Sequence, residues 1–126
     1  ALATALADYP LHDALELRGA ACSSVCGSAL DLGFELDAAG RIVAIGMKVS
    51  ACAIGQAAAA LFAQSAKDRS KSDVQSALAQ IEAWLRGDHG ELPDWPGLDA
   101  IASAVAYPGR HGAIVLPWKA ALAALP

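Results

Sequence analysis

The chain has 126 residues, the length of one ordinary domain, which can bury a core without disulfides. Its 31 alanines raise the hydrophobic share to 56%, and because Ala favours helices, this composition indicates a helix-rich soluble protein. No apolar run approaches the roughly 20 residues that span a bilayer, and the opening segment lacks the basic stretch of a signal peptide. The net charge of −4 and the scattered Lys and Arg residues offer no basic face for nucleic acid. We therefore expect a single cytoplasmic domain over residues 1–126 that binds neither nucleic acid nor membrane.

Two segments with alternating polarity predict a β-hairpin. Residues 30–36 alternate apolar with polar or small side chains, which is the period of a strand with one buried face. Residues 37–40 then supply a turn, and residues 43–49 alternate again. Two antiparallel strands joined by a short loop are the natural interpretation.

Helical spacing begins directly after the hairpin. Ile54, Leu61 and Phe62 recur with helical period, which predicts a helix from residue 53 to about residue 66. Ser72 followed three residues later by Gln75 indicates a capping box, which predicts that a second helix starts there and ends near residue 87.

Two further helices are predicted in the last third of the chain. A short helix over residues 98–106 is stopped by Pro108, and a final helix runs from about residue 111 to 125. Within that last helix, Pro117 is tolerable only in the first turn or at a kink. Because strands gather early and helices follow, we expect an α+β fold: a small antiparallel sheet with helices packed on one face.

The three cysteines, Cys22, Cys26 and Cys52, are an odd number in a chain expected to be cytoplasmic, which argues against a disulfide framework. Cys26 precedes the first hairpin strand and Cys52 follows the second, so antiparallel pairing brings their positions to one end of the sheet. Cys52 also lies at a helix N-terminus, whose dipole favours a thiolate. A reactive or metal-binding pair and simple packing both explain this pattern, which by itself favours neither.

The segments around these cysteines resemble the U-type iron–sulfur cluster scaffold proteins, a family that includes IscU, SufU and the NifU N-terminal domain. Cys26-Gly27-Ser28 with its following strand is similar to the family's Cys-Gly-Asp segment, and the step of 26 residues to Cys52 matches the spacing to its second cysteine. The stretch CAIGQAAAALFAQ resembles the small-residue helix that follows that cysteine.

The C-terminal stretch is most similar to the SufU branch, and the likeness covers most of the chain. The residues that match this branch are Tyr107, Pro108, Arg110, Leu116, Trp118 and Lys119. The resemblance implies a SufE/NifU-like fold, a role in iron–sulfur cluster assembly rather than an enzymatic activity, and a cysteine desulfurase as partner.

Two departures from the family pattern make the ligand set incomplete. The family's third cysteine falls on Ala113 and its aspartate falls on Ser28. Family members hold zinc or a nascent cluster through three cysteines and the aspartate, or with a histidine in place of one ligand. The resemblance therefore implies that metal, an iron–sulfur cluster or sulfur is bound through Cys26 and Cys52, with two ligands missing.

Two other residues are candidates to complete such a site. Cys22 lies four residues before Cys26, and His111 lies two residues before Ala113. Each also has a structural explanation, Cys22 as packing under the sheet edge and His111 as an exposed cap of the last helix. Ser28 and Arg110 are expected beside the bound group, where Ser28 would hydrogen-bond to it.

Two alternatives to the scaffold function stay open. A sulfur acceptor like the SufE proteins, which share this fold, needs only a Cys52 thiolate. An interaction module without a site would instead have buried and inert cysteines. Among the tryptophans, Trp84 and Trp118 fall on helix stripes and are expected in the core, whereas Trp95 is the candidate for an exposed partner anchor.

Overall fold

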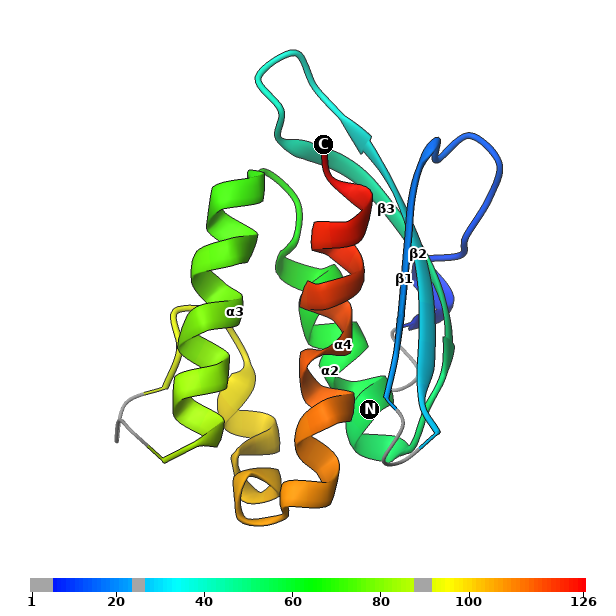
Figure 1. The fold of residues 1–126 in the computed structure, drawn as a ribbon. Coiled ribbons are helices and arrows are strands. Elements are labelled where there is room, and N and C mark those ends of the chain that lie inside the picture. The colour runs from blue at the N-terminus through cyan, green and yellow to red at the C-terminus, as the bar shows by residue number, and fades with distance from the viewer. Residues whose placement is uncertain (1–5, 24–26, 88–91) are drawn as a thin grey trace.

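The structure, a computed structural model, describes residues 6–23, 27–87 and 92–126. Its elements in chain order are η1 (Leu6–Asp8), β1 (Leu17–Cys22), β2 (Ala29–Leu36), β3 (Ile42–Ser50), α2 (Ala53–Ser65), α3 (Lys71–Leu85), η2 (Leu98–Ala106) and α4 (Pro108–Ala124). The three α-helices lie on one face of the antiparallel sheet, and α4 is the helix that runs beside β1 and β2 (Figure 1). The α+β architecture expected from the sequence is confirmed.

The sheet has three strands in the order β1-β2-β3, with both pairs antiparallel. The predicted hairpin is β2 and β3, whose register pairs Ala29 with Ser50 and Phe34 with Ile45. The strand β1 was not predicted, because its Arg-Gly-Ala-Ala stretch lacks a recognisable apolar alternation. Tertiary packing stabilises this strand, since a side chain at Gly19 would overlap the backbone carbonyl of Ala120 in α4.

The face of the sheet opposite the helices is partly covered by the segment that leads into β1. Leu15 is 1% exposed and packs over Gly33 and Gly46, which pair with each other across β2 and β3. A Cβ atom at Gly33 would stand 2.9 Å from the Leu15 Cβ, so the two glycines make room for this segment.

An aromatic cluster fills the core between the sheet and the helices. Phe62 stacks on Trp95 with ring centroids 5.2 Å apart and meets Trp118 edge-on at 5.5 Å. The prediction that Trp95 is exposed is wrong: it is 2% exposed, and its indole N–H donates to the Leu61 carbonyl at 3.0 Å. The guanidinium of Arg69 covers the same ring at 4.5 Å from its centroid. Residues 92–98 therefore fold back onto α2 instead of presenting an aromatic anchor to a partner.

The other two tryptophans are buried, as predicted. Trp84 is 8% exposed on α3, and Trp118 is fully buried on α4. The indole nitrogen of Trp118 has no hydrogen-bond partner within the part of the chain that the structure describes. Its burial therefore rests on packing against the neighbouring rings.

The start of α3 is two residues earlier than the capping-box prediction. Ser70, not Ser72, is the N-cap: its hydroxyl accepts a hydrogen bond from the Asp73 backbone N–H, and its own N–H donates to the Asp73 carboxylate. This backbone hydrogen bond from Ser70 holds the pKa of Asp73 below its ordinary value. The predicted end is close to the observed one, since α3 ends at Leu85 and Gly87 adopts a positive φ of 78°.

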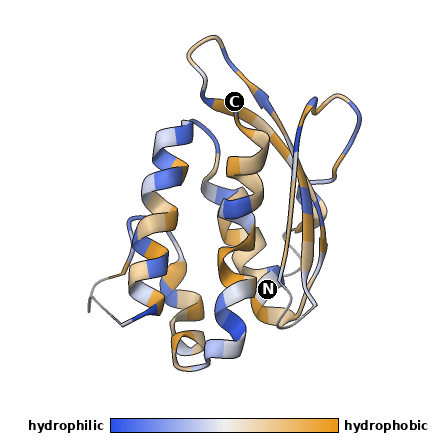
Figure 2. Ribbon diagram, in the orientation of Figure 1, coloured by the Kyte–Doolittle hydropathy of each residue, from blue (hydrophilic) through white to orange (hydrophobic). Residues whose placement is uncertain are grey.

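The last two helices also differ in detail from the prediction. Residues 98–106 form 3-10 turns that are interrupted by a kink at Ile101, and α4 begins at Pro108, where the missing N–H of proline costs nothing. Pro117 lies inside α4 rather than in its first turn, so it cannot donate to the Ala113 carbonyl one turn earlier. Most of α4 is coloured as hydrophobic beyond its first turn (Figure 2), because it is packed between the sheet and the other helices.

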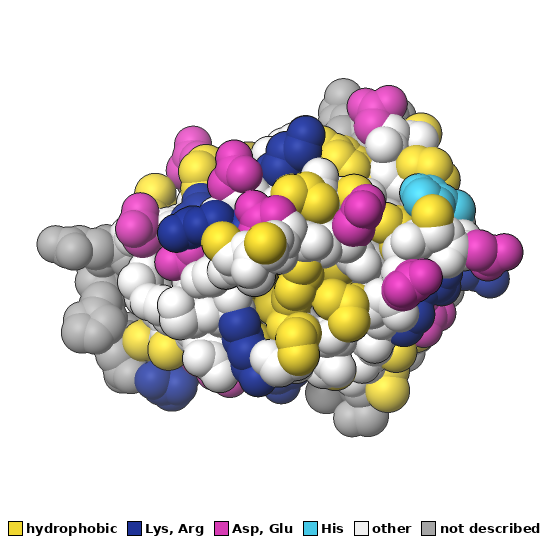
Figure 3. Space-filling view, turned by 90° about the horizontal axis from the view of Figure 1, so that it is seen from above, with side chains coloured by type: hydrophobic (Ala, Val, Ile, Leu, Met, Phe, Trp, Pro, Cys, Tyr) yellow, Lys and Arg dark blue, Asp and Glu magenta, His cyan; other side chains and the backbone are white. Residues whose placement is uncertain are grey.

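The surface at the β2–β3 turn and the chain's C-terminus is mixed in charge. Acidic and basic side chains are interspersed around exposed apolar residues on this face (Figure 3). None of the helices in the described ranges has the length and apolar character needed to cross a membrane.

Candidate functional site

The end of β1, the start of β2 and the end of β3 lie at the same end of the sheet, and Cys22 and Cys52 are located there. Cys22 ends β1 and pairs with Ala29 at the start of β2, which in turn pairs with Ser50 at the end of β3. Cys52 follows Ser50 by two residues. The register therefore brings the start of β2 and the end of β3 together, as the hairpin predicted; Cys26 lies outside the described residues.

Cys52 is the N-cap residue of α2, as the sequence predicted. Its backbone is extended, with φ −65° and ψ 171°, and its carbonyl accepts a hydrogen bond from the Gln56 N–H at 2.9 Å. The Gln56 side chain also donates to the Ala51 carbonyl at 3.0 Å, which holds the chain at the entry to the helix. Cys52 is partly exposed, and its side chain makes no capping hydrogen bond at the helix N-terminus.

Ser28 and Ala113, the two positions at which the sequence resemblance implies missing ligands, converge beside the first turn of α2. A Cβ atom on Gly55 would lie 3.3 Å from the Ala113 Cβ and 3.8 Å from the Ser28 hydroxyl oxygen. Ser28 is 1% exposed and Ala113 is fully buried. The start of β2, the first turn of α2 and the second turn of α4 thus meet closely, without an open ligand position at 28 or 113.

Ser23 belongs to the same cluster, although no sequence pattern predicted it. It is 8% exposed, and its backbone N–H donates to the Ser28 carbonyl at 2.8 Å, which closes the loop between β1 and β2. A Cβ atom on Gly112 would stand 2.5 Å from the Ser23 hydroxyl oxygen, so this serine fills the space against α4. Its only sequence signal was its place between two cysteines, in a loop whose pairing requires the unpredicted strand β1.

Cys22 is exposed at the end of β1, so it is not packed beneath the sheet edge. Its strand neighbour is Ala29, whereas Leu30 is buried towards the helices. Side chains alternate between the faces of a strand, so Cys22 lies on the face away from the helices. The structure therefore does not bring Cys22 together with Ser28 and Ala113, which are buried on the helix side.

His111 lies in the first turns of α4 and is half-buried rather than an exposed cap. Its ring nitrogen Nε2 stands 2.8 Å from the Val105 carbonyl oxygen, a hydrogen bond that connects α4 to η2. The ring lines a hollow between α3 and α4 that also contains Glu82 and Lys119. Arg110, the neighbouring residue, is exposed.

The described residues do not supply the donor set of a complete metal site. Among them, no group of three or more His, Cys, Asp or Glu side chains is placed to hold a metal ion. Ala113 has no donor atom, and the Ser28 hydroxyl is neutral and buried. Because closed structural zinc sites have four ligands, Cys52 would need ligands from outside the described part of this chain.

Comparison with solved structures gives similarity over nearly the whole chain. A nitrogen-fixing NifU-like protein (N-terminal) from Brucella abortus superposes with a TM-score of 0.83 at 18% identity, over 98% of this chain and 88% of that one. A candidate iron–sulfur cluster assembly scaffold protein for the SUF system from Fervidobacterium islandicum gives 0.82 at 19% identity, over 97% and 94%. A hypothetical protein gives 0.69 at 20% identity, over 98% and 96%.

None of the protein-family models matches the chain, and no curated protein matches it in sequence. The likeness is therefore carried by the fold. The chain has the fold of the NifU-like N-terminal structure, as the sequence resemblance implied.

Proposed function

We propose that this protein belongs to the U-type scaffold family and acts in iron–sulfur cluster assembly. In this proposal Cys26 and Cys52 bind iron, a nascent cluster or sulfur as cargo, with an incomplete ligand set. A cysteine desulfurase supplies the sulfur, and the protein itself is not an enzyme.

The observation that carries this proposal is the position of Cys52 within a fold shared almost end to end with the two named structures. Cys52 is partly exposed and begins α2, and a Cβ atom on Gly55 in the same helix turn would lie within 3.8 Å of Ala113 and Ser28, where the resemblance implies the other two ligands. The third cysteine and the aspartate are replaced by Ala113 and Ser28, but the elements that would carry them still converge. The missing ligands would come from a small thiol, from a second subunit, or from Cys22 or His111 after rearrangement.

Anaerobic reconstitution with iron and sulfide tests the scaffold function. We expect wild-type protein to retain both elements after desalting, and Cys26→Ala and Cys52→Ala each to lose most of them, because each variant lacks one of two anchoring thiolates. Ser76→Ala, on the exposed surface of α3, is the matched control and should bind as wild type does. Absence of metal from the wild type, or equal binding in the cysteine variants, would contradict the proposal.

A second candidate function is that of a SufE-like sulfur acceptor. It is favoured because the described residues around Cys52 supply no set of metal ligands. Acceptance of sulfur requires one accessible thiol and no further ligands, which fits a partly exposed Cys52 beside buried Ser28 and Ala113. The Cys52 thiolate would attack the outer sulfur of the desulfurase persulfide. The sulfur–sulfur bond of the donor breaks, a new one forms on Cys52, and the donor cysteine leaves as a thiolate, without a net change in oxidation state.

Mass spectrometry after incubation with a cysteine desulfurase and cysteine distinguishes this candidate. We expect the peptide that contains Cys52 to gain the mass of one sulfur atom, and Cys52→Ser to abolish the gain in the intact protein. Cys22→Ser is the control, because Cys22 is exposed at the same sheet end but does not cap a helix. Sulfur found equally on Cys22 would indicate nonspecific transfer and contradict the assignment.

The third alternative, an interaction module with inert cysteines, requires buried thiols. Cys22 is exposed and Cys52 is partly exposed, so the two described cysteines do not have this property.

A further inference from the structure

The outer edge of β3 is covered at two points that flank a short open stretch. At one end, the Met47 N–H donates to the Tyr9 carbonyl at 2.8 Å. At the other end, Ile42 donates to the Arg69 carbonyl at 2.9 Å and accepts from the Asp68 N–H at 2.8 Å. A sheet edge normally exposes unpaired backbone groups, and here the chain covers the edge at Ile42 and at Met47 and leaves the stretch between them open.

Between these two points, the backbone of Ile45 presents both of its hydrogen-bonding groups to the open side. The pairing of β3 with β2 is regular from Ala44 to Met47, so alternate residues point their N–H and C=O groups away from β2. Because the N–H of Met47 points outward, those of Ile45 do so as well. No described residue hydrogen-bonds to Ile45 on that side.

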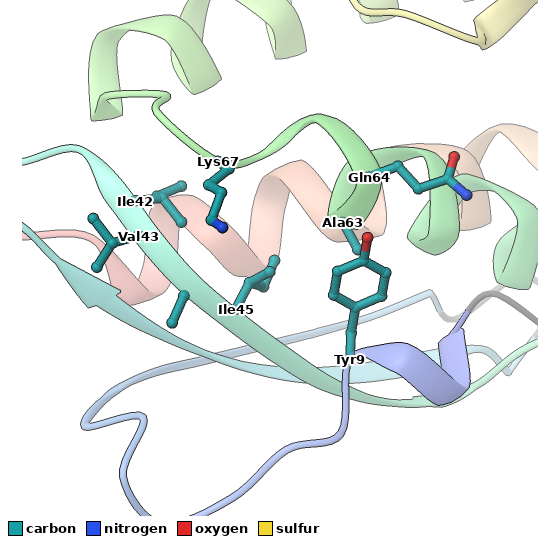
Figure 4. Close-up of a pocket in the computed structure, with 8 residues that line it drawn as sticks. Tyr9, Ile42, Val43, Ile45, Ala63, Gln64 and Lys67 are labelled. Carbon is teal, nitrogen blue, oxygen red and sulfur yellow. The ribbon is translucent and has the colours of Figure 1, made fainter.

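A cavity of about 270 Å³ lies beside this open stretch, between the edge of β3 and the end of α2 (Figure 4). Its walls are mainly apolar, with Ile42, Ile45 and Ala63 among them, and Tyr9 stands at the Met47 end. Lys67 is the single charged residue among its described lining residues, and it is adjacent to Asp68 at the Ile42 end. Lys67 is exposed and has no hydrogen bond or ion pair with any other described residue.

We propose that this β3 edge binds the C-terminal tail of a partner protein as a short added strand. Backbone hydrogen bonds to Ile45 would hold the tail, and an apolar side chain of the tail would enter the cavity. An antiparallel strand runs from the Met47 end to the Ile42 end, which brings its terminal carboxylate to the Lys67 ammonium group.

The length of the open stretch selects a chain terminus over an internal segment. The stretch from Val43 to Gly46 spans roughly 13 Å at about 3.3 Å per residue, which fits three or four residues of the tail. The edge is occupied by Asp68 and Arg69 at Ile42 and by Tyr9 at Met47, so residues of the partner beyond either end must leave the sheet. Among the described lining residues, only Lys67, at the Ile42 end, offers a charged partner to a terminal carboxylate. A tail that ends at Lys67 satisfies the geometry and also neutralises the lysine charge.

Amide NMR with the peptide acetyl-Ser-Thr-Val-Thr-Val, carrying a free C-terminal carboxylate, tests the proposal on the full chain. We expect saturable shifts of the amide signals of residues 43–46 and slower hydrogen exchange at Ile45. The same peptide with an amidated C-terminus should bind about tenfold more weakly, since the hydrogen-bonded ion pair with Lys67 is lost. Lys67→Glu should weaken the free-acid peptide at least as much.

Lys48→Glu is the matched control, because Lys48 lies on the same strand but outside the cavity and carries the same charge change. It should leave binding within about twofold of wild type, which is well below a 1 kcal/mol effect. No saturable shift at millimolar peptide, shifts centred elsewhere, or equal binding of the amidated peptide would each overturn the proposal. The comparison of the two peptides uses wild-type protein only, so it does not depend on the folding of a variant.

Discussion

The double variant Ser28→Asp with Ala113→Cys is expected to bind zinc with a dissociation constant about 100-fold lower than that of the wild type. Both positions lie beside Gly55, which follows Cys52 by three residues. A Cβ atom on Gly55 would lie 3.3 Å from the Ala113 Cβ and 3.8 Å from the Ser28 hydroxyl oxygen. With Cys26 and Cys52, the double variant would have the three thiolates and one carboxylate that its family resemblance implies, and four ligands are what zinc requires.

Stability measured with and without zinc gives the clearest measurement of this gain. A carboxylate at the buried position 28 and a thiol at the buried position 113 should destabilise the metal-free variant by about 1–3 kcal/mol each. Zinc at about 100 times its dissociation constant should then restore roughly 2.7 kcal/mol in urea unfolding. Wild type should show no comparable response to zinc.

Two further variants make the outcome specific. Ser28→Asn with Ala113→Ser has nearly the same size but neither a carboxylate nor a thiolate, so it should not respond to zinc. Cys52→Ala in the background of the aspartate and cysteine variant should abolish the response. If wild type binds zinc as tightly as the double variant, Ser28 and Ala113 are not the reason for the incomplete site.

Trp118→Ala is expected to lower the free energy of unfolding by about 3–5 kcal/mol. Trp118 is fully buried and meets Phe62 and Trp95 edge-on, with ring centroids 5.5 Å and 5.4 Å away. Its removal leaves a cavity in the middle of the aromatic cluster between α2 and α4. Urea unfolding followed by circular dichroism measures this loss, which is a large part of the total stability of a domain this size.

Tyr107→Ala is the surface control for this measurement. Tyr107 is 64% exposed, so its truncation should change the stability by no more than about 0.5 kcal/mol. Trp118→Phe should be much milder than Trp118→Ala, because it keeps a ring and removes an indole nitrogen that has no partner in the described structure. A loss below about 1 kcal/mol in Trp118→Ala would contradict the view that the cluster organises the core.

Local periodicity was enough to predict the elements whose patterns are self-contained. The hairpin of residues 29–50 has a two-residue period, and α2 has a helical period that begins directly after Cys52. These patterns also placed Cys52 at a helix N-terminus, because the change of period marks the residue at which strand becomes helix. The order of strands and helices then predicted the α+β class.

Several site features depended on contacts that no local pattern records. The strand β1 packs on α4, and only that strand shows that Cys22 faces away from the helices and that Ser23 is buried against α4. Trp95 lies in a turn-rich, acidic segment, which predicted exposure, but stacking on Phe62 and a hydrogen bond to α2 bury it.

By itself, the sequence determined which residue types stand at the positions of interest: thiols at 26 and 52, and no ligand atom at 113. Tertiary structure alone decided that Ser28 and Ala113 are buried against the first turn of α2 and that Cys52 stays partly exposed. The physical reason is that burial depends on residues far apart in the chain. The start of β2, the start of α2 and the second turn of α4 meet only when the helices pack on the sheet.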